Sequence, residues 1–328
     1  MRRTVHQKRM RSVNFPFARP LDASLASQLR FFRDFRRASP GEIFRIRYRV
    51  ANSPLQASEQ PRWEDKVSVL DVLSNSAMQF VANVQDFSYL AAQSLKNLLS
   101  GPHYLQDLLD QMDDIGVGSL PIVLLTGFFI GVVMVLQTGS QFTRFGQSAL
   151  TGDVVSIALV RELGPTLTGI FVAGRCAAGI ASELGSMLVT EQVDAMRAMG
   201  TDPSRKLVTP RVLAAILMQP LLTGLADFVG LLGGCAASVF SLRLSAVEFW
   251  TRAIDALEFG DLMQGMMKPV AFGFILATVG CYKGLTVRGG TQGVGRATTQ
   301  AVVISSVLII ISDAFLTKLA LYLADKVF

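Results

Sequence analysis

Long apolar stretches recur along the chain and dominate its hydropathy pattern. A helix needs about 20 apolar residues to cross a hydrocarbon core of about 30 Å. Stretches of this length occur near 119–138, 153–181, 210–240, 266–284 and 298–324. The pattern therefore predicts an all-α integral membrane protein with about five transmembrane helices.

A different pattern precedes the first of these stretches. Between residues 67 and 116, apolar residues recur at helical spacing, for example at Val84, Phe87 and Ala91, with polar residues between them. Helices of this kind suit the membrane interface better than the membrane interior. We therefore expect a basic, poorly ordered N-terminal extension (1–66), interfacial amphipathic helices (67–116) and a membrane domain (117–328).

The second crossing is interrupted by charges and by residues that disfavour a regular helix. Arg161 and Glu162 precede a Gly164-Pro165 pair within it. Proline lacks an N–H and clashes with the preceding turn. We expect this helix to be broken or kinked near Gly164.

Small residues also recur in the second crossing. They form small-xxx-small steps from Gly174 to Ala178 and from Ala177 to Ala181. Such steps let helix backbones approach closely inside a membrane. Tight packing of this helix, within or between subunits, is the expected result.

Composition agrees with the membrane interpretation. Half of the 328 residues are apolar and 17% are charged, which is too apolar and too poor in charge for an ordinary soluble domain of this length. Cys176, Cys235 and Cys281 lie in apolar stretches without CxxC spacing. We expect small core thiols, with no disulfide or metal site.

The charges predict the orientation of the chain. The net charge is +6, and basic residues cluster before residue 67 and in the segments around 197–211 and 283–296. With five crossings, these three basic regions fall on the same side, which the positive-inside rule makes cytoplasmic. The N-terminus is then cytoplasmic and the C-terminus lies opposite, and nucleic-acid binding is not needed to explain the basic cluster.

A polar segment between the second and third apolar stretches, "TEQVDAMRAMGTDP" (190–203), has the signals of a short helix. Thr190 is the expected N-cap, Asp194 lies in the first turn, and Gly200 ends the helix. Its apolar residues Val193, Met196 and Met199 are expected to be exposed and to require a partner.

The region around this segment resembles a known family. "RELGPTLTGIFVAGRCAAGIASELGSMLVTEQVDAMRAMGTDPSRKLVTPRVLA" (161–214) is similar to the signature of MlaE-type permeases, the membrane subunits of ABC systems that move phospholipids. Fainter similarity extends from about residue 75 to the C-terminus. The resemblance covers all five predicted crossings and leaves residues 1–66 outside.

The resemblance implies an assembly. It implies a homodimer of this chain, a separate cytoplasmic ATPase that uses ATP and Mg, and an MCE-domain partner on the far side of the membrane. The chain itself would be a non-catalytic subunit that binds no cofactor. Its location would be a bacterial inner membrane, or alternatively a plastid inner envelope, because the Arg-rich, acid-poor first 66 residues also fit an organellar transit peptide.

The resemblance also assigns a role to the polar helix at 190–203. It corresponds to the coupling helix that the ATPase grips, and "DAMRAMG" looks like the corresponding loop of other ABC permeases. The residues expected to couple to the ATPase are Glu191, Gln192, Asp194, Met196, Arg197, Met199, Gly200, Asp202 and Pro203.

A path for the lipid is expected within the membrane. Charges are costly there and usually face a cavity or a partner, so Arg161, Glu162, Arg175 and Glu183 are candidates for a path that tolerates headgroups. An apolar wall is expected from the first crossing, at Phe129, Val133, Leu136 and Gln137. For Asp227 and Asp313, pairing with a base such as Lys268 is the preferred interpretation.

Other function classes leave distinguishable signals. A secondary transporter of an amphipathic or lipid-like substrate is the main alternative, because broken helices with buried charge are also typical of such carriers. An intramembrane enzyme is not expected, since Arg161 and Glu162 have no accompanying nucleophile or metal cluster. "GTQGVGRATT" is not expected to bind nucleotide, because Arg296 and Ala297 replace the lysine and hydroxyl residue of a phosphate loop.

Overall fold

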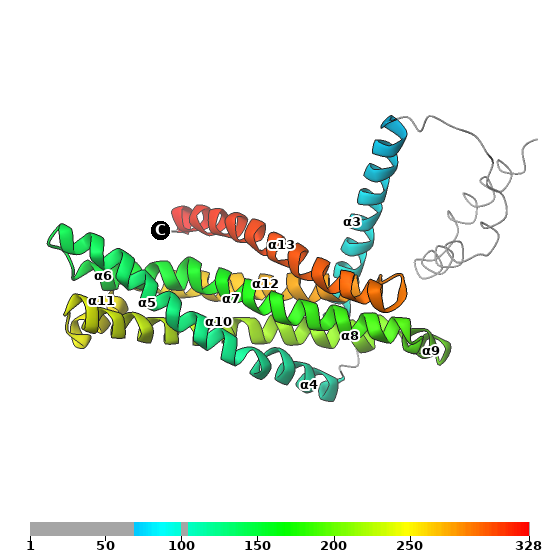
Figure 1. Ribbon diagram of the computed structural model, residues 1–328, viewed down its shortest axis with the longest axis horizontal. Helices are drawn as coiled ribbons and strands as arrows, with labels where there is room; N and C mark the ends of the chain where they lie inside the picture. The colour runs from blue at the N-terminus through cyan, green and yellow to red at the C-terminus, as the bar shows by residue number, and fades with distance from the viewer. Residues whose placement is uncertain (1–68, 100–103, 328) are drawn as a thin grey trace, which may run out of the picture. The chain divides into compact units, whose positions relative to one another are not determined.

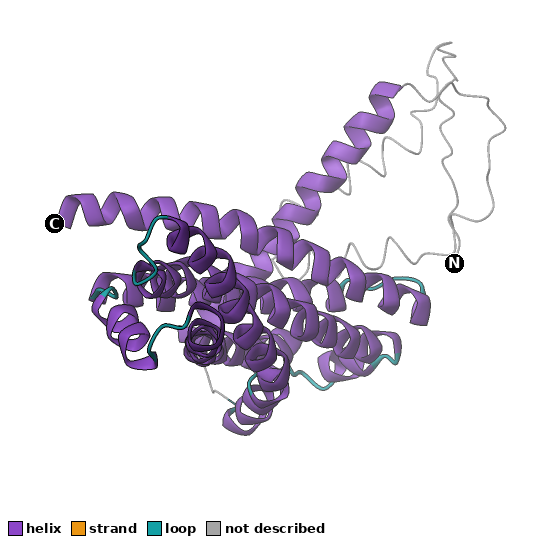
Figure 2. Ribbon diagram, turned by 60° about the vertical axis from the view of Figure 1, so that its left-hand side comes forward, coloured by secondary structure: helices purple, strands orange, loops and turns teal. Residues whose placement is uncertain are grey.

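The computed structural model describes residues 69–99 and 104–327. The chain divides into two units, residues 1–69 and 70–328, and the predicted N-terminal extension 1–66 lies outside the described residues. All elements that the structure describes are helices joined by short loops (Figure 2). The α-helices are α3 (Val69–Leu99), α4 (Leu105–Ile115), α5 (Leu120–Arg144), α6 (Leu150–Ala158), α7 (Gly164–Val172), α8 (Ala178–Val189), α9 (Gln192–Ala198), α10 (Thr209–Leu242), α11 (Ala246–Asp255), α12 (Phe259–Leu285) and α13 (Gly290–Val327).

Five of the resulting helical segments are long and apolar enough to cross a membrane, which confirms the predicted number. Four of them begin and end beyond the apolar stretches read from the sequence, and the fifth begins before its stretch, because polar residues continue the helices past the apolar runs. Their bounds are Leu105–Arg144, Leu150–Val189, Ser204–Leu242, Phe259–Leu285 and Gly290–Tyr322. The chain is therefore a multi-pass, all-α membrane protein (Figure 1).

The second crossing is distorted where the sequence predicts it, but it is not broken. It consists of α6, α7 and α8 joined by two π turns, at Leu159–Leu163 and Ala173–Ala177. In the first π turn, the Gly164 N–H donates to the Leu159 carbonyl oxygen, five residues back. The wider turn relieves the constraint that Pro165 places on a regular helix, so the chain continues through it.

Glycines bring α5 and α10 into backbone contact. A Cβ atom on Gly127 would lie 2.8 Å from the Ala226 carbonyl oxygen, and one on Gly131 would collide with the Gly230 carbonyl oxygen. In the second crossing, Ala177 and Ala181 are fully buried in a cluster with Val279 of α12 and Ala301 of α13. Close packing at that small-xxx-small step is thus confirmed within one chain, whereas Gly174 has no neighbour within 4 Å.

Gly131→Val is expected to destabilise the fold by about 2–3 kcal/mol, because the added side chain overpacks a backbone contact that cannot yield. Denaturant unfolding in detergent micelles measures this change. The matched control is Gly179→Ala, where the structure shows open space around the new Cβ atom. Its free energy of unfolding should change by less than about 1 kcal/mol. Equal losses in both variants would contradict the close α5–α10 contact.

The short helices pack at the ends of the crossings. α11 lies against α6 through Phe249 and Ala253, which join a small apolar cluster with Val155 and Val135. α4 leads through a 3-10 turn at Val117–Ser119 into α5. The helices α3 and α4 lie in the range where amphipathic helices were predicted, and their position at the membrane interface stays a prediction.

Candidate functional site

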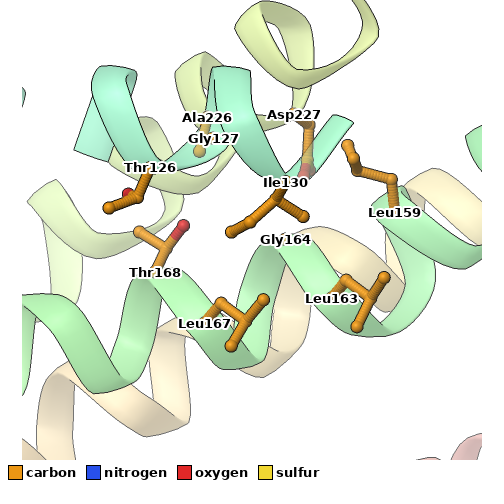
Figure 3. Close-up of a pocket in the computed structure, with 10 residues that line it drawn as sticks. All are labelled: Thr126, Gly127, Ile130, Leu159, Leu163, Gly164, Leu167, Thr168, Ala226 and Asp227. Atoms are coloured by element: carbon orange, nitrogen blue, oxygen red, sulfur yellow. The ribbon is translucent and has the colours of Figure 1, made fainter. Parts of the chain in front are cut away.

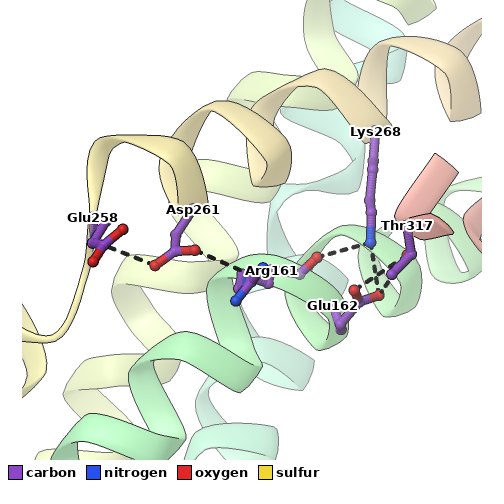
Figure 4. Close-up of polar contacts among 6 residues, drawn as sticks. All are labelled: Arg161, Glu162, Glu258, Asp261, Lys268 and Thr317. Atoms are coloured by element: carbon purple, nitrogen blue, oxygen red, sulfur yellow. Dashed lines mark hydrogen bonds and ion pairs between the residues drawn. The ribbon is translucent and has the colours of Figure 1, made fainter. Parts of the chain in front are cut away.

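A buried lysine organises a cluster of charges inside the membrane domain. Lys268 of α12 is 2% exposed. Its Nζ donates to Glu162 Oε2 at 2.7 Å and lies 3.1 Å from Asp313 Oδ1 of α13. Thr317 of α13 donates to the two Glu162 carboxylate oxygens at 3.2 and 3.3 Å (Figure 4). The cluster therefore ties the second crossing to α12 and α13.

The Gly164-Pro165 pair explains why the ammonium sits at this point. In a regular helix the Arg161 carbonyl oxygen would accept from the N–H of residue 165, but proline has none. Lys268 Nζ supplies the missing donor at 3.0 Å. Gly265, one turn before Lys268, allows the approach, because a Cβ atom there would collide with the Val160 carbonyl oxygen. The proline thus creates a polar position on a transmembrane helix, and the lysine occupies it.

Arg161 belongs to the neighbouring pair. Its Nε lies 3.2 Å from Asp261 Oδ1 near the start of α12. Asp261 also accepts from the Glu258 backbone N–H at 3.2 Å, as part of a capping box that begins the helix. Arg161 and Glu162 are therefore both held by α12, in adjacent contacts (Figure 4).

The other predicted charges of the lipid path lie in separate pairs. Arg175 donates to the Asp114 carbonyl oxygen at 2.7 Å and to the Asp114 carboxylate at 3.0 Å. Glu183 lies 2.7 Å from the guanidinium of Arg211, a buried residue at the start of α10. The four predicted charges thus form four separate ion pairs. In the sequence, Arg211 closes the basic segment around 197–211; the structure places it within α10 and pairs it with Glu183.

The predicted apolar wall faces outward from the single chain. Phe129, Val133, Leu136 and Gln137 are exposed along α5. They recur at spacings of three and four residues, which places most of them on one stripe of the helix. Within the described chain, nothing covers this stripe.

Asp227 and Asp313 have different environments. Asp313 pairs with Lys268, as predicted. The same prediction is wrong for Asp227, which lies on α10 beside a small cavity between α5, α7 and α10 (Figure 3). Its Oδ1 atom has no hydrogen-bond partner among the described residues. The difference arises because α10 presents Asp227 to Gly164 and α5 instead of to α12.

The polar segment at 190–203 forms the short helix α9, with a start that differs from the prediction. Glu191, in left-handed backbone conformation (φ 61°), is the N-cap, and its carbonyl oxygen accepts from the Ala195 N–H at 2.9 Å. Thr190 instead donates its hydroxyl to the Ser186 carbonyl oxygen at 2.9 Å and so ends α8. The N-cap prediction at Thr190 is therefore wrong by one residue.

The end of α9 follows the predicted stop at Gly200. Gly200 has φ 80°, its N–H donates to the Arg197 carbonyl oxygen, and the Thr201 N–H donates to the Met196 carbonyl oxygen, both at 3.0 Å. These two bonds form a Schellman motif, which fixes the direction of the chain after the helix. Asp202 then accepts from the Ser204 N–H at 2.9 Å, and Pro203 leads into the turn before α10.

The faces of α9 differ in burial. Val193 is fully buried and Met196 packs against the main apolar cluster, so the prediction that these residues are exposed is wrong. Met199 is 75% exposed, as predicted. Asp194 and Arg197 form a 2.9 Å ion pair one turn apart, and Gln192 is exposed beside them. The helix is anchored on one side and offers a mixed polar and apolar surface on the other.

This arrangement has counterparts in known proteins. Residues 108–319, from α4 to α13, match the family model described as Permease MlaE. The chain belongs to the MlaE permease family. The matched region of this MlaE-family permease contains the Lys268 cluster, Asp227 and the whole of α9.

Relatives of this MlaE-family permease come from several lineages. A probable ABC transporter permease protein of Rickettsia typhi is 39% identical over 253 residues, which cover 77% of this chain and 98% of that protein. Protein TRIGALACTOSYLDIACYLGLYCEROL 1, chloroplastic, of Arabidopsis thaliana is 35% identical over 81% of this chain and 73% of its own. The intermembrane phospholipid transport system permease protein MlaE of Haemophilus influenzae is 32% identical over 65% of this chain and 82% of its own. The chain is thus an ABC transporter permease of this family.

Proposed function

We propose that this permease moves phospholipid between two membranes, driven by a separate ATPase chain. The name of the Haemophilus influenzae relative supports the substrate class. The observation that carries the proposal is α9, a short capped helix between two crossings with an anchored side and an exposed side. The MlaE-family match favours this function over the alternative of a secondary transporter driven by an ion gradient.

α9 is suited to pass a movement of the ATPase into the membrane domain. Its buried residue Val193 belongs to the same apolar cluster as Leu184 of α8 and Val212 of α10. The Schellman motif and the Asp202-Pro203 turn join it to α10 with few freely rotating bonds. A force on Met199, Asp194 or Arg197 therefore displaces two crossings, whereas a flexible loop would absorb it. ATP and Mg would be used by the ATPase alone.

The lipid path would form between two copies of the chain. The uncovered stripe of Phe129, Val133, Leu136 and Gln137 on α5 supplies an apolar wall for acyl chains. Arg175 contacts Ser119, just before the apolar run of α5 begins, and this places a partly exposed guanidinium near headgroup level. Glu162 and Arg161 supply further polar positions deeper in the second crossing. Each copy would contribute one such set.

The orientation follows from the basic residues at the α9 end. Arg197, Arg205 and Lys206 lie at this end, which the positive-inside rule makes cytoplasmic. The ATPase would bind there, and an MCE-domain partner would bind at the opposite end, where α11 lies. The proposed location is a bacterial inner membrane, with the plastid inner envelope as the alternative suggested by residues 1–66.

Affinity purification from native membranes, followed by mass spectrometry of proteins and lipids, tests this proposal. We expect an ATPase, an MCE-domain protein and phospholipid to co-purify. The reconstituted assembly should then transfer fluorescent phospholipid only when ATP is present. Transfer by the chain alone on an ion gradient would overturn the proposal and establish a secondary transporter.

A further inference from the structure

Asp227 lies inside the membrane domain, and no charged side chain among the described residues pairs with it. Its side chain is on α10 at the level of Gly127 on α5 and Gly164 at the start of α7, and only 8% of the residue is exposed. A Cβ atom on Gly164 would collide with Asp227 Oδ1, so the carboxyl packs directly on the glycine backbone. An ionised carboxylate in such a place carries a large desolvation cost unless a cation accompanies it.

The surrounding elements do not supply that cation. The charged residue of α5 is Arg144, at the far end of the helix, and α7 has no titratable residue. Arg161 and Glu162, in the turn before α7, are engaged by Asp261 and Lys268 of α12. The other charge within α10, Arg211, pairs with Glu183 more than four turns away. The groups packed around Asp227 thus leave its charge unbalanced.

The cavity beside Asp227 decides which ligand fits. It has room for about one water-sized molecule, which excludes a lipid headgroup. Its lining is mostly apolar, with Ile130, Leu163 and Leu167 among it. Thr126 uses its hydroxyl to donate to the Ile122 carbonyl oxygen at 2.6 Å, which leaves Thr168 as the second polar side chain on the cavity (Figure 3). A hard metal cation requires about six oxygen ligands, and this site offers too few.

We propose that Asp227 is a proton-binding site of the membrane domain. The carboxylate accepts a proton from a hydronium ion in the adjacent cavity and leaves a water molecule there. The neutral acid gains an O–H donor, and its burial between α5, α7 and α10 then carries no charge. The site is independent of the proposed substrate and partners.

Infrared spectroscopy of the purified full chain in detergent tests this assignment directly. A protonated carboxyl has a carbonyl-stretch band that is distinct from the bands of a carboxylate. We expect Asp227→Asn to remove one such band from the spectrum recorded near neutral pH. The control is Asp255→Asn, which removes an exposed carboxyl of α11 and should leave the protonated band unchanged. Loss of a carboxylate band in Asp227→Asn, with the protonated band unchanged, would overturn the proposal.

The pH dependence of the free energy of unfolding, compared between the wild type and Asp227→Asn, gives a second readout. Asn has the size of the neutral acid and cannot ionise. An unfolded aspartate releases its proton near pH 4, so between this pH and the pH at which the folded Asp227 ionises, the folded wild type holds one more proton than its unfolded form. Relative to Asp227→Asn, the wild-type unfolding constant should then rise by up to about tenfold for each pH unit. Parallel pH curves for the two proteins would contradict proton binding at Asp227.

Discussion

Lys268→Met is expected to lower the free energy of unfolding by about 3 kcal/mol. The ammonium is almost fully buried and faces the carboxylates of Glu162 and Asp313. Methionine fills a similar volume but leaves both carboxylates without their cation, and removing one partner of a buried ion pair typically costs about 3–5 kcal/mol. The lower end of this range applies to Lys268→Met because the Glu162 side chain is partly exposed. Denaturant unfolding in detergent micelles measures the loss.

Two further variants separate the ion cluster from the general effect of losing a lysine. Lys318→Met changes an exposed lysine of α13 and should alter the free energy of unfolding by less than about 0.5 kcal/mol. The double variant Lys268→Met with Asp313→Asn removes one of the orphaned carboxylates and should regain part of the loss. If the double variant is no more stable than Lys268→Met, Asp313 is not part of the charge balance.

Met199→Glu is expected to weaken binding of the proposed partner ATPase by about 30-fold. This loss corresponds to about 2 kcal/mol of binding free energy, the usual threshold for a residue that contributes strongly to an interface. The Met199 side chain projects from the end of α9 and is 75% exposed, so replacing it with a charged side chain removes no packing from the fold. The free energy of unfolding should therefore stay within about 0.5 kcal/mol of the wild type. Titration with the ATPase that co-purifies with the wild type measures the affinity.

Val247→Glu provides the matched control for this experiment. Val247 is exposed to the same extent, 75%, on α11, and α11 and α9 lie at opposite ends of the crossings in Figure 1. It introduces the same charge on an equally exposed apolar residue. Binding of the ATPase should remain at the wild-type level. If both variants weaken binding equally, the effect is a general one of charge and α9 is not the ATPase contact.

The crossings could be predicted from sequence because lipid imposes a simple requirement. A span needs a run of apolar residues of a certain length, and this requirement does not depend on the neighbours of the helix. The ends of the helices were harder to predict, since outside the hydrocarbon they obey local capping. The Thr190 prediction failed for this reason: its hydroxyl finds an acceptor in the preceding helix, and Glu191 takes the cap position.

The sequence identifies the charged residues of the membrane domain but, for most of them, not their ion-pair partners. A charged residue within an apolar run is easily recognised in the sequence, as Arg161 and Glu162 are. Its partner depends on which helices are neighbours and at what height, which composition does not encode. One local signal in the sequence indicates such a contact: Pro165 removes the N–H donor for the Arg161 carbonyl oxygen, which therefore needs a donor from elsewhere, and Lys268 supplies it.

The sequence also did not predict which residues of α9 are buried. The helix has 7 residues, which is two turns and too few for an apolar period to show. Val193 and Met199 are both apolar and differ in burial because only Val193 meets the apolar cluster that includes residues of α8 and α10. The predicted exposure of Met199 is confirmed, because Gly200 turns the chain away directly after it.

The two π turns of the second crossing change its angular phase. Each wider turn contains about one residue more than an α-helical turn, which rotates all following side chains by about 100° relative to a regular helix. A helical wheel drawn through 150–189 with a constant step therefore places the residues after Ala177 nearly opposite their actual positions. The charged residues of this helix reach three neighbours: Arg161 and Glu162 contact α12, Arg175 contacts α4, and Glu183 contacts α10. Deleting a single residue from either π turn would redirect every contact that follows it while leaving the length and hydropathy of the span almost unchanged.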